Sequence, residues 1–90
     1  MPRYLVERDF PAGLPIAADA TGARLCHEVI ARNAEDGVTW LHTFVTTDRL
    51  RTYCIYDAPS PESLRRAAAR NSLPVRHVVE VHDLSPYFHH

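Results

Sequence analysis

The sequence predicts an α+β fold in which two helices cover one face of a four-stranded antiparallel sheet. A length of ninety residues is the first observation, and it allows one domain, residues 1–90, because domains typically run to about 100–150 residues. Apolar runs of strand length occur four times, and two segments with helical apolar spacing lie between them. The strand-like runs are residues 3–9, 38–45, 50–56 and 75–84.

The first strand and the first helix are separated by a loop. Apolar residues alternate imperfectly with charged ones over residues 3–9, and two prolines then break the chain. Asp19 or Thr21 is expected to cap a helix that runs to about Ala34. Its predicted inward stripe is Leu25, Cys26, Val29, Ile30 and Asn33.

The middle of the chain predicts a hairpin followed by the second helix. Residues 38–45 and 50–56 are two apolar runs joined by a short polar turn. Ser60, Pro61 and Glu62 then start a helix, as N-cap, first helical residue and acid at the positive end of the helix dipole.

The second helix is expected to end near Asn71, and residues 75–84 form the last strand before a tail at residues 85–90. Leu64, Ala67 and Ala68 are its predicted buried residues. The resulting order, β-α-β-β-α-β, is that of the ferredoxin-like sandwich.

Composition and charge exclude several classes of protein. Ten basic residues oppose eleven acidic ones, for a net charge of −1, which argues against a nucleic-acid binder driven by bulk charge. No apolar run reaches the ~18 residues of a membrane span, and the N-terminus lacks a signal-peptide core. Two cysteines are too few for a disulfide framework. We therefore expect a soluble cytoplasmic protein.

Both faces of the predicted sheet are apolar, although helices cover only one. Trp40 and Phe44 are expected on one face and Leu41 and Val45 on the other, and the neighbouring strands show the same two-sided pattern. Such a bare apolar face favours association. We expect a homodimer through the helix-free face, of the dimeric α+β barrel type; the alternative is that residues 10–16 or the C-terminal tail cover it.

A metal site is one interpretation of the polar residues that interrupt the strands. A three-residue hairpin turn would place His42 opposite Cys54 and Trp40 opposite Tyr56, whereas an even turn would place His42 opposite Tyr53. In the first case imidazole and thiolate would suit nickel, copper or zinc. The predicted ligands are Glu7, His42, Cys54 and His77. The alternative is a histidine hydrogen-bonded at a subunit interface and a cysteine packed as an apolar side chain.

A ligand pocket near the hairpin is the second interpretation. Its predicted lining residues are Trp40, Tyr53, Tyr56 and Asp57. In a small enzyme or ligand carrier of this fold, His42, Tyr56 and Cys54 would bind ligand or transfer protons. The sequence contains no legible nucleophile, base and orienting group, so enzymatic activity stays open.

The remaining histidines carry less information. His27 lies on the first helix and is expected at the surface, and His82 is expected at a solvent-facing strand end. The terminal His89 and His90 are either native metal ligands or the remainder of a purification tag.

Three strings resemble a small bacterial family of unknown function that includes an actinobacterial nickel-binding protein. They are PRYLVER near the N-terminus, VTWLHTFVTTDRLRTYCIYDAPSPESLRRAAARN across the hairpin and second helix, and LPV after it. The resemblance implies a ferredoxin-like fold, a homodimer, and nickel bound at sites on the dimer, for sequestration or storage. It also implies ligand roles for Glu7, His42 and Cys54, from their places in the shared strings.

Overall fold

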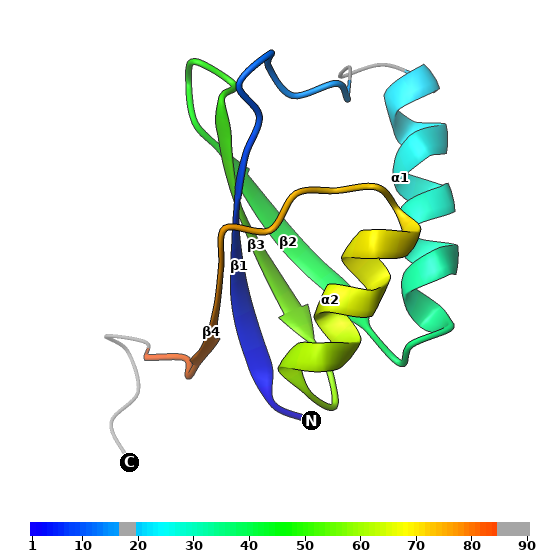
Figure 1. The fold of residues 1–90 in the computed structure, drawn as a ribbon, viewed down its shortest axis with the longest axis vertical. Helices are drawn as coiled ribbons and strands as arrows, with labels where there is room; N and C mark the ends of the chain where they lie inside the picture. The colour runs from blue at the N-terminus through cyan, green and yellow to red at the C-terminus, as the bar shows by residue number, and fades with distance from the viewer. Residues whose placement is uncertain (17–19, 85–90) are drawn as a thin grey trace.

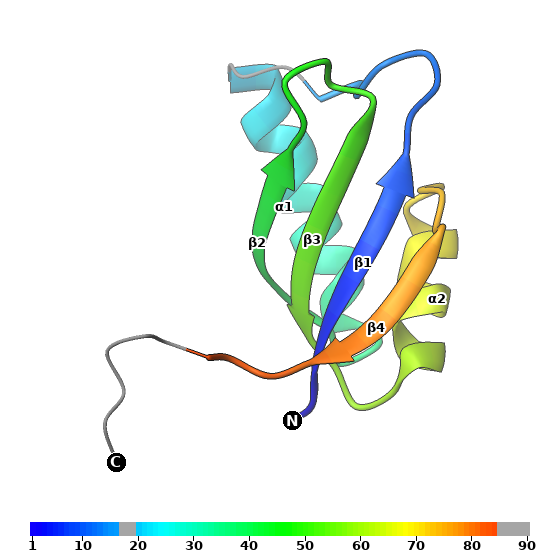
Figure 2. The same cartoon turned by 90° about the vertical axis from the view of Figure 1, so that its left-hand side faces the viewer.

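The fold is an α+β sandwich of one antiparallel sheet and two helices, as the sequence predicts (Figures 1 and 2). The computed structural model describes residues 1–16 and 20–84. Neighbouring strands follow the order β2-β3-β1-β4, and every pair is antiparallel. The elements are β1 (Arg3–Asp9), α1 (Ala20–Ala34), β2 (Thr39–Val45), β3 (Arg51–Asp57), α2 (Pro61–Arg70) and β4 (His77–Val81).

Local signals begin α2 where the sequence predicts. The Ser60 hydroxyl accepts a hydrogen bond from the Ser63 backbone N–H at 3.2 Å, and the Ser63 hydroxyl accepts one from the Ser60 N–H at 3.3 Å. This reciprocal capping box satisfies two backbone donors that a helix start leaves without partners. Leu64, Ala67 and Ala68 are buried, which confirms the predicted face.

The core lies between the sheet and the helices. It joins the inward residues of β1 and β3 to the buried face of α2, and Trp40, Val75 and Val78 pack against it. Its members are Tyr4, Val6, Val38, Cys54, Tyr56, Ala58, Leu64 and Ala67.

The first helix packs less closely than its predicted stripe suggests. Asn33 is buried and Cys26 and Val29 are half-buried, but Leu25 and Ile30 are exposed. Cys26 and Val29 border a cavity under the helix. The N-terminal half of α1 therefore does not press directly on the sheet.

A β-bulge in β2 changes the predicted hairpin register. Trp40 lies opposite Tyr56, as a three-residue turn predicts, but His42 then lies opposite Ile55 rather than Cys54. Leu41 is the extra residue at the bulge, so the alternation of side chains shifts there. The predicted His42–Cys54 pair is wrong, because the two side chains lie on opposite faces.

The shift in β2 also corrects the predicted grouping of its apolar residues. Trp40 and Val45 line the cavity under the helices, whereas Phe44 lies opposite Tyr53 on the other face. The helix-free face, which Figure 2 presents to the viewer, therefore carries Phe44 and not Trp40.

An apolar patch crosses the middle of the helix-free face. Of its members, Leu5, Ile55 and Val79 share one register. Phe44 and Tyr53 lie in the next register, beside Glu7 and His77, and Val81 lies opposite Arg3. Phe44 is 59% exposed and Val79 is 52% exposed. The loop after β1 does not cover this patch, because Phe10, Leu14 and Ile16 line the cavity on the helix side. Residues 85–90, the other expected cover, lie outside the described residues.

Ion pairs bound the patch at both ends of the strands. Arg3 donates to Asp57 at 3.1 Å and to Asp83 at 2.5 Å. At the other end, Asp9 accepts from Arg51 and Arg76, both at 2.8 Å. The helix-free face therefore carries apolar side chains from all four strands between two groups of ion pairs, with Glu7 and His77 beside them.

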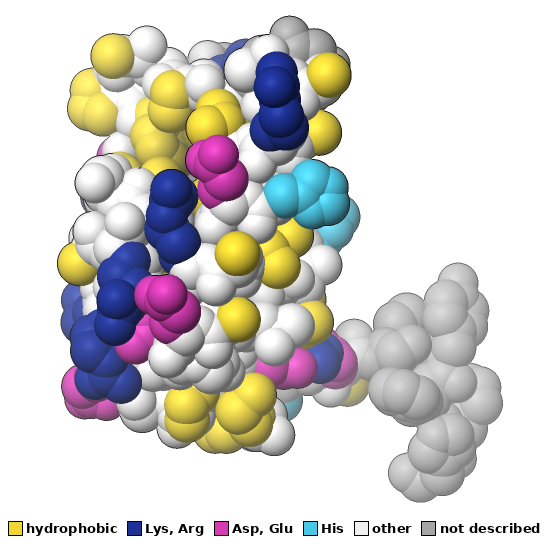
Figure 3. Space-filling view, turned by 90° about the vertical axis from the view of Figure 1, so that its right-hand side faces the viewer, with side chains coloured by type: hydrophobic (Ala, Val, Ile, Leu, Met, Phe, Trp, Pro, Cys, Tyr) yellow, Lys and Arg dark blue, Asp and Glu magenta, His cyan; other side chains and the backbone are white. Residues whose placement is uncertain are grey.

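On the helix side, basic and acidic side chains lie next to each other (Figure 3). Asp36, in the turn after α1, accepts hydrogen bonds from Arg66 at 3.3 Å and from Arg70 at 2.9 Å. These ion pairs tie α2 to the end of α1. In residues 1–16 and 20–84, no helix is long and apolar enough to cross a bilayer.

Candidate functional site

Glu7 and His77 are the predicted metal ligands that the structure brings together. They are directly opposite each other on the neighbouring strands β1 and β4, and both lie on the helix-free face. The His77 side chain is exposed. Arg76 approaches Oε2 of Glu7 with its Nε at 3.0 Å, so Oε1 is the oxygen better placed to bind an ion.

His42 shares the face of Glu7 and His77 but lies too far from them for one ion. Two other strands separate β2 from β4, and neighbouring strands are about 4.8 Å apart. The His42 ring instead contacts the Phe44 ring edge-on, with 4.6 Å between centroids.

Cys54 lies on the opposite face and cannot join the other predicted ligands. It is buried among the core residues, and its thiol contacts the Thr52 hydroxyl at 3.8 Å. Within one chain, the described residues contain no group of three histidine, cysteine, aspartate or glutamate side chains that could hold a metal. The four predicted ligands therefore do not form one intrachain site.

The same separation prevents His42 and Cys54 from acting together as base and nucleophile. A nucleophilic Cys54 would need His42 within hydrogen-bond reach, and the bulge places the imidazole on the other side of the sheet.

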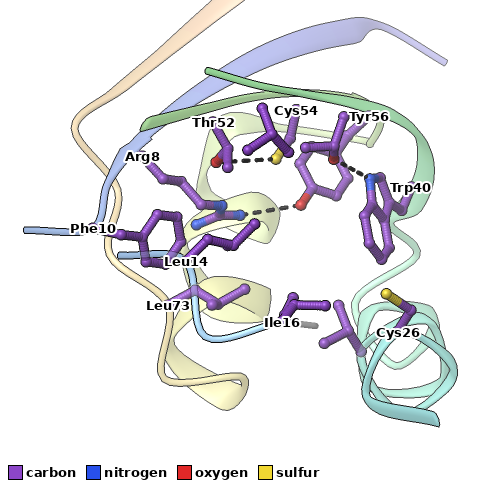
Figure 4. A pocket seen from close by; sticks show the side chains of 13 residues that line it. Arg8, Phe10, Leu14, Ile16, Cys26, Trp40, Thr52, Cys54, Tyr56 and Leu73 are labelled. Atoms are coloured by element: carbon purple, nitrogen blue, oxygen red, sulfur yellow. Dashed lines mark hydrogen bonds between the residues drawn. The ribbon is translucent and has the colours of Figure 1, made fainter. Parts of the chain in front are cut away.

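A cavity of about 180 Å³ lies between the sheet and the helices (Figure 4). Side chains from the loop after β1, from α1 and from the sheet line it, and most are apolar. Trp40 and Tyr56 line it, as predicted. Tyr53 and Asp57 do not, because they alternate with Tyr56 along β3 and lie on the helix-free face, where Asp57 pairs with Arg3.

Arg8 is the charged residue of the cavity, and the sequence analysis missed it. It is only 4% exposed. Its Nη1 donates to the Pro74 carbonyl at 2.7 Å and its Nη2 donates to the Tyr56 hydroxyl at 3.2 Å. Nε is buried and has no hydrogen-bond partner among the described residues. The available signal was its position in β1, in phase with Tyr4 and Val6, where an apolar side chain is expected.

The cavity environment keeps the Tyr56 phenol neutral. Burial raises the pKa of Tyr56 to about 12; the neighbouring Cys54 adds to the rise, and the Arg8 cation opposes it. The guanidinium carbon lies 5.9 Å from the centre of the Tyr56 ring, within cation–π range.

Comparison with known proteins identifies the family. The model of the family described as "Nickel responsive protein SCO4226-like" matches residues 4–81. The chain belongs to this SCO4226-like family. Apart from Arg3, the first residue of β1, the match includes every strand and both helices.

A solved structure supports the fold of this family member. The crystal structure of SCO4226 from Streptomyces coelicolor A3(2) matches with a TM-score of 0.72. The two chains are 14% identical, and the match covers 92% of this chain and 99% of the other. At this identity the likeness concerns the fold alone. No curated protein matches the chain significantly.

Proposed function

We propose that this protein binds nickel as a homodimer formed through the helix-free face, and that it sequesters or stores the metal. Membership of the nickel-responsive SCO4226-like family is the observation that carries the proposal. Glu7 and His77, side by side on that face, are the ligands that support it.

The chemistry of this pair suits a first-row divalent metal. Imidazole nitrogen binds nickel, copper and zinc well, and a carboxylate oxygen supplies a compensating charge. Two ligands from one chain are too few for a stable site, but a two-fold axis would add the same two from a second copy. Arg76 competes for Glu7, yet it also pairs with Asp9, so it can stay anchored when a metal takes the other carboxylate oxygen.

The layout of the helix-free face supports the dimer. Apolar side chains flanked by charged groups are the usual arrangement of a protein interface. Exposed side chains such as Phe44 and Val79 would leave water on association. A chain of ninety residues also buries too little surface alone to be very stable.

Calorimetric titration with nickel tests the proposal. The titrated protein carries the substitutions His89→Ala and His90→Ala, so that the terminal histidines do not contribute. We expect saturable binding with micromolar or tighter affinity. His77→Ala and Glu7→Gln should each weaken it at least about tenfold, since loss of groups even one layer outside a metal site costs ~10–100-fold.

His27→Ala is the matched control, because His27 is exposed on α1 and outside the pair. It should leave the affinity unchanged. Absence of saturable binding, or an unchanged affinity in His77→Ala, would contradict the proposal. Parallel titrations with zinc and copper identify the preferred metal, and copper is expected to bind most tightly in vitro on general grounds.

A further inference from the structure

The cavity between the sheet and the helices is unused by the proposed nickel site, and it has the size of a small ring compound. An engineered apolar cavity of about 150 Å³ accommodates benzene, and this one measures about 180 Å³. Trp40, Val29 and Leu14 are among the apolar side chains that form its walls (Figure 4 labels most of the lining).

One cation breaks this apolar lining. Among the described residues around the cavity, Arg8 alone carries a formal charge. The acidic residues on either side of it in β1, Glu7 and Asp9, lie on the opposite face and pair with Arg76. A buried cation without a counter-charge is unfavourable. An anionic ligand in the cavity would therefore supply the counter-charge that Arg8 lacks.

The hydrogen bonds around Arg8 point to the same missing group. Nε–H has no partner among the described residues, and the other two nitrogens each donate to a neutral oxygen. Guanidinium groups pair best with planar carboxylates, through two parallel hydrogen bonds. The neutral Tyr56 phenol adds a donor beside Arg8, because its present neighbour Cys54 is a weak acceptor.

We propose that this cavity binds a small apolar monocarboxylate, about the size of benzoate or cyclohexanecarboxylate, with its carboxylate on Arg8 and Tyr56 and its ring among the apolar walls. A single cation matches a monoanion. The apolar walls disfavour a phosphate or a dicarboxylate, since either would bury a second charge without a partner.

The single tryptophan of the chain, Trp40, lines the cavity and reports on binding through its fluorescence. The full chain is titrated with cyclohexanecarboxylate and with the neutral cyclohexanecarboxamide, in the presence of a chelator that removes nickel. The carboxylate should bind saturably and about tenfold to a hundredfold more tightly than the amide, as hydrogen bonds to a charged group predict. Failure here leaves the nickel proposal untouched, because no metal takes part.

Two variants and a control locate the site. Arg8→Met should bind the acid and the amide equally, whereas Arg65→Met, on the exposed side of α2, should keep the preference for the acid. Val29→Phe fills the cavity and should lose both ligands while Arg8 remains.

Three results would each overturn the proposal: no saturable binding of the carboxylate to the unmodified chain, equal binding of acid and amide to it, or unchanged binding to Val29→Phe. Circular dichroism checks the fold of each variant. If Arg8→Met does not fold, the acid–amide comparison and Val29→Phe still decide.

Discussion

Replacing Phe44 with alanine should weaken the proposed dimer without unfolding the chain. Phe44 is 59% exposed on β2, an edge strand of the sheet, and lies on the helix-free face; full burial of a phenylalanine contributes about 1.5–3 kcal/mol. Burying the exposed part therefore gains about 1–2 kcal/mol per copy, and a two-fold axis doubles this to about 2–4 kcal/mol. The dissociation constant of the dimer should rise about 30- to 700-fold.

Sedimentation equilibrium over a range of concentrations measures this change. The unmodified chain should sediment at twice its 10.2 kDa mass, and Phe44→Ala should dissociate at concentrations where the unmodified chain does not. Ile30→Ala is the matched control, because Ile30 is similarly exposed, at 48%, but lies on α1. A monomeric unmodified chain, or equal effects of the two substitutions, would refute the reasoning.

The other predictions concern stability, measured by urea unfolding. Leu64→Ala removes a core side chain that is 3% exposed and should lower the free energy of unfolding by about 2–5 kcal/mol; a loss below 1 kcal/mol would mean that α2 does not pack as described. Ser60→Ala removes the N-cap of α2 and should cost about 1 kcal/mol, so an unchanged midpoint would contradict the cap. Hydrogen bonds from Arg76 and Arg51 lower the pKa of Asp9 below its ordinary 3.8. The contribution of Asp9 to the free energy of unfolding is therefore fully present above its ordinary pKa of 3.8, and it is lost as the pH falls through the lowered pKa. Asp9→Asn should flatten this acid loss, and an identical pH profile would argue against the pairing.

The parts of the fold that depend on local sequence could be predicted. The start of α2 is one example, because a serine cap, a proline and an acid act within one helical turn. The strands were also predicted in the right order, since their apolar runs are long enough to exceed chance patterns.

The candidate site could be predicted only in part, because a bulge that no local signal marks places His42 and Cys54 on opposite faces of the sheet. Leu41 is neither a glycine nor a proline, so nothing in the hairpin sequence distinguishes it. A side-chain hydrogen bond within β2 accompanies the bulge: the Trp40 Nε1 donates to the Thr43 hydroxyl at 2.7 Å. Residues three apart lie on opposite faces of a regular strand, so this bond requires the irregularity. The bulge determines on which face His42 lies, whereas Glu7 and His77 lie on strands that the bulge does not touch.

Arg8 shows the complementary difficulty. A charged residue between two others, in the run Glu7-Arg8-Asp9, suggests a solvated segment. The alternation of β1 places Arg8 on the buried face with Tyr4 and Val6, and the two acids on the other face. Charge in a strand has to be assigned to a face before it says anything about a site.

The bulge also determines which changes in chain length β2 can tolerate. Omitting Leu41 would restore a regular strand and still leave Trp40 beneath the helices and His42 on the helix-free face. A one-residue gap at this point therefore leaves the side chains on both faces of the sheet unchanged. Omitting Thr43 instead would move each later side chain of β2 to the opposite face of the sheet and turn Phe44 toward the helices. Relatives that differ by an indel at the first position should retain both surfaces, whereas those that differ at the second should have exchanged them.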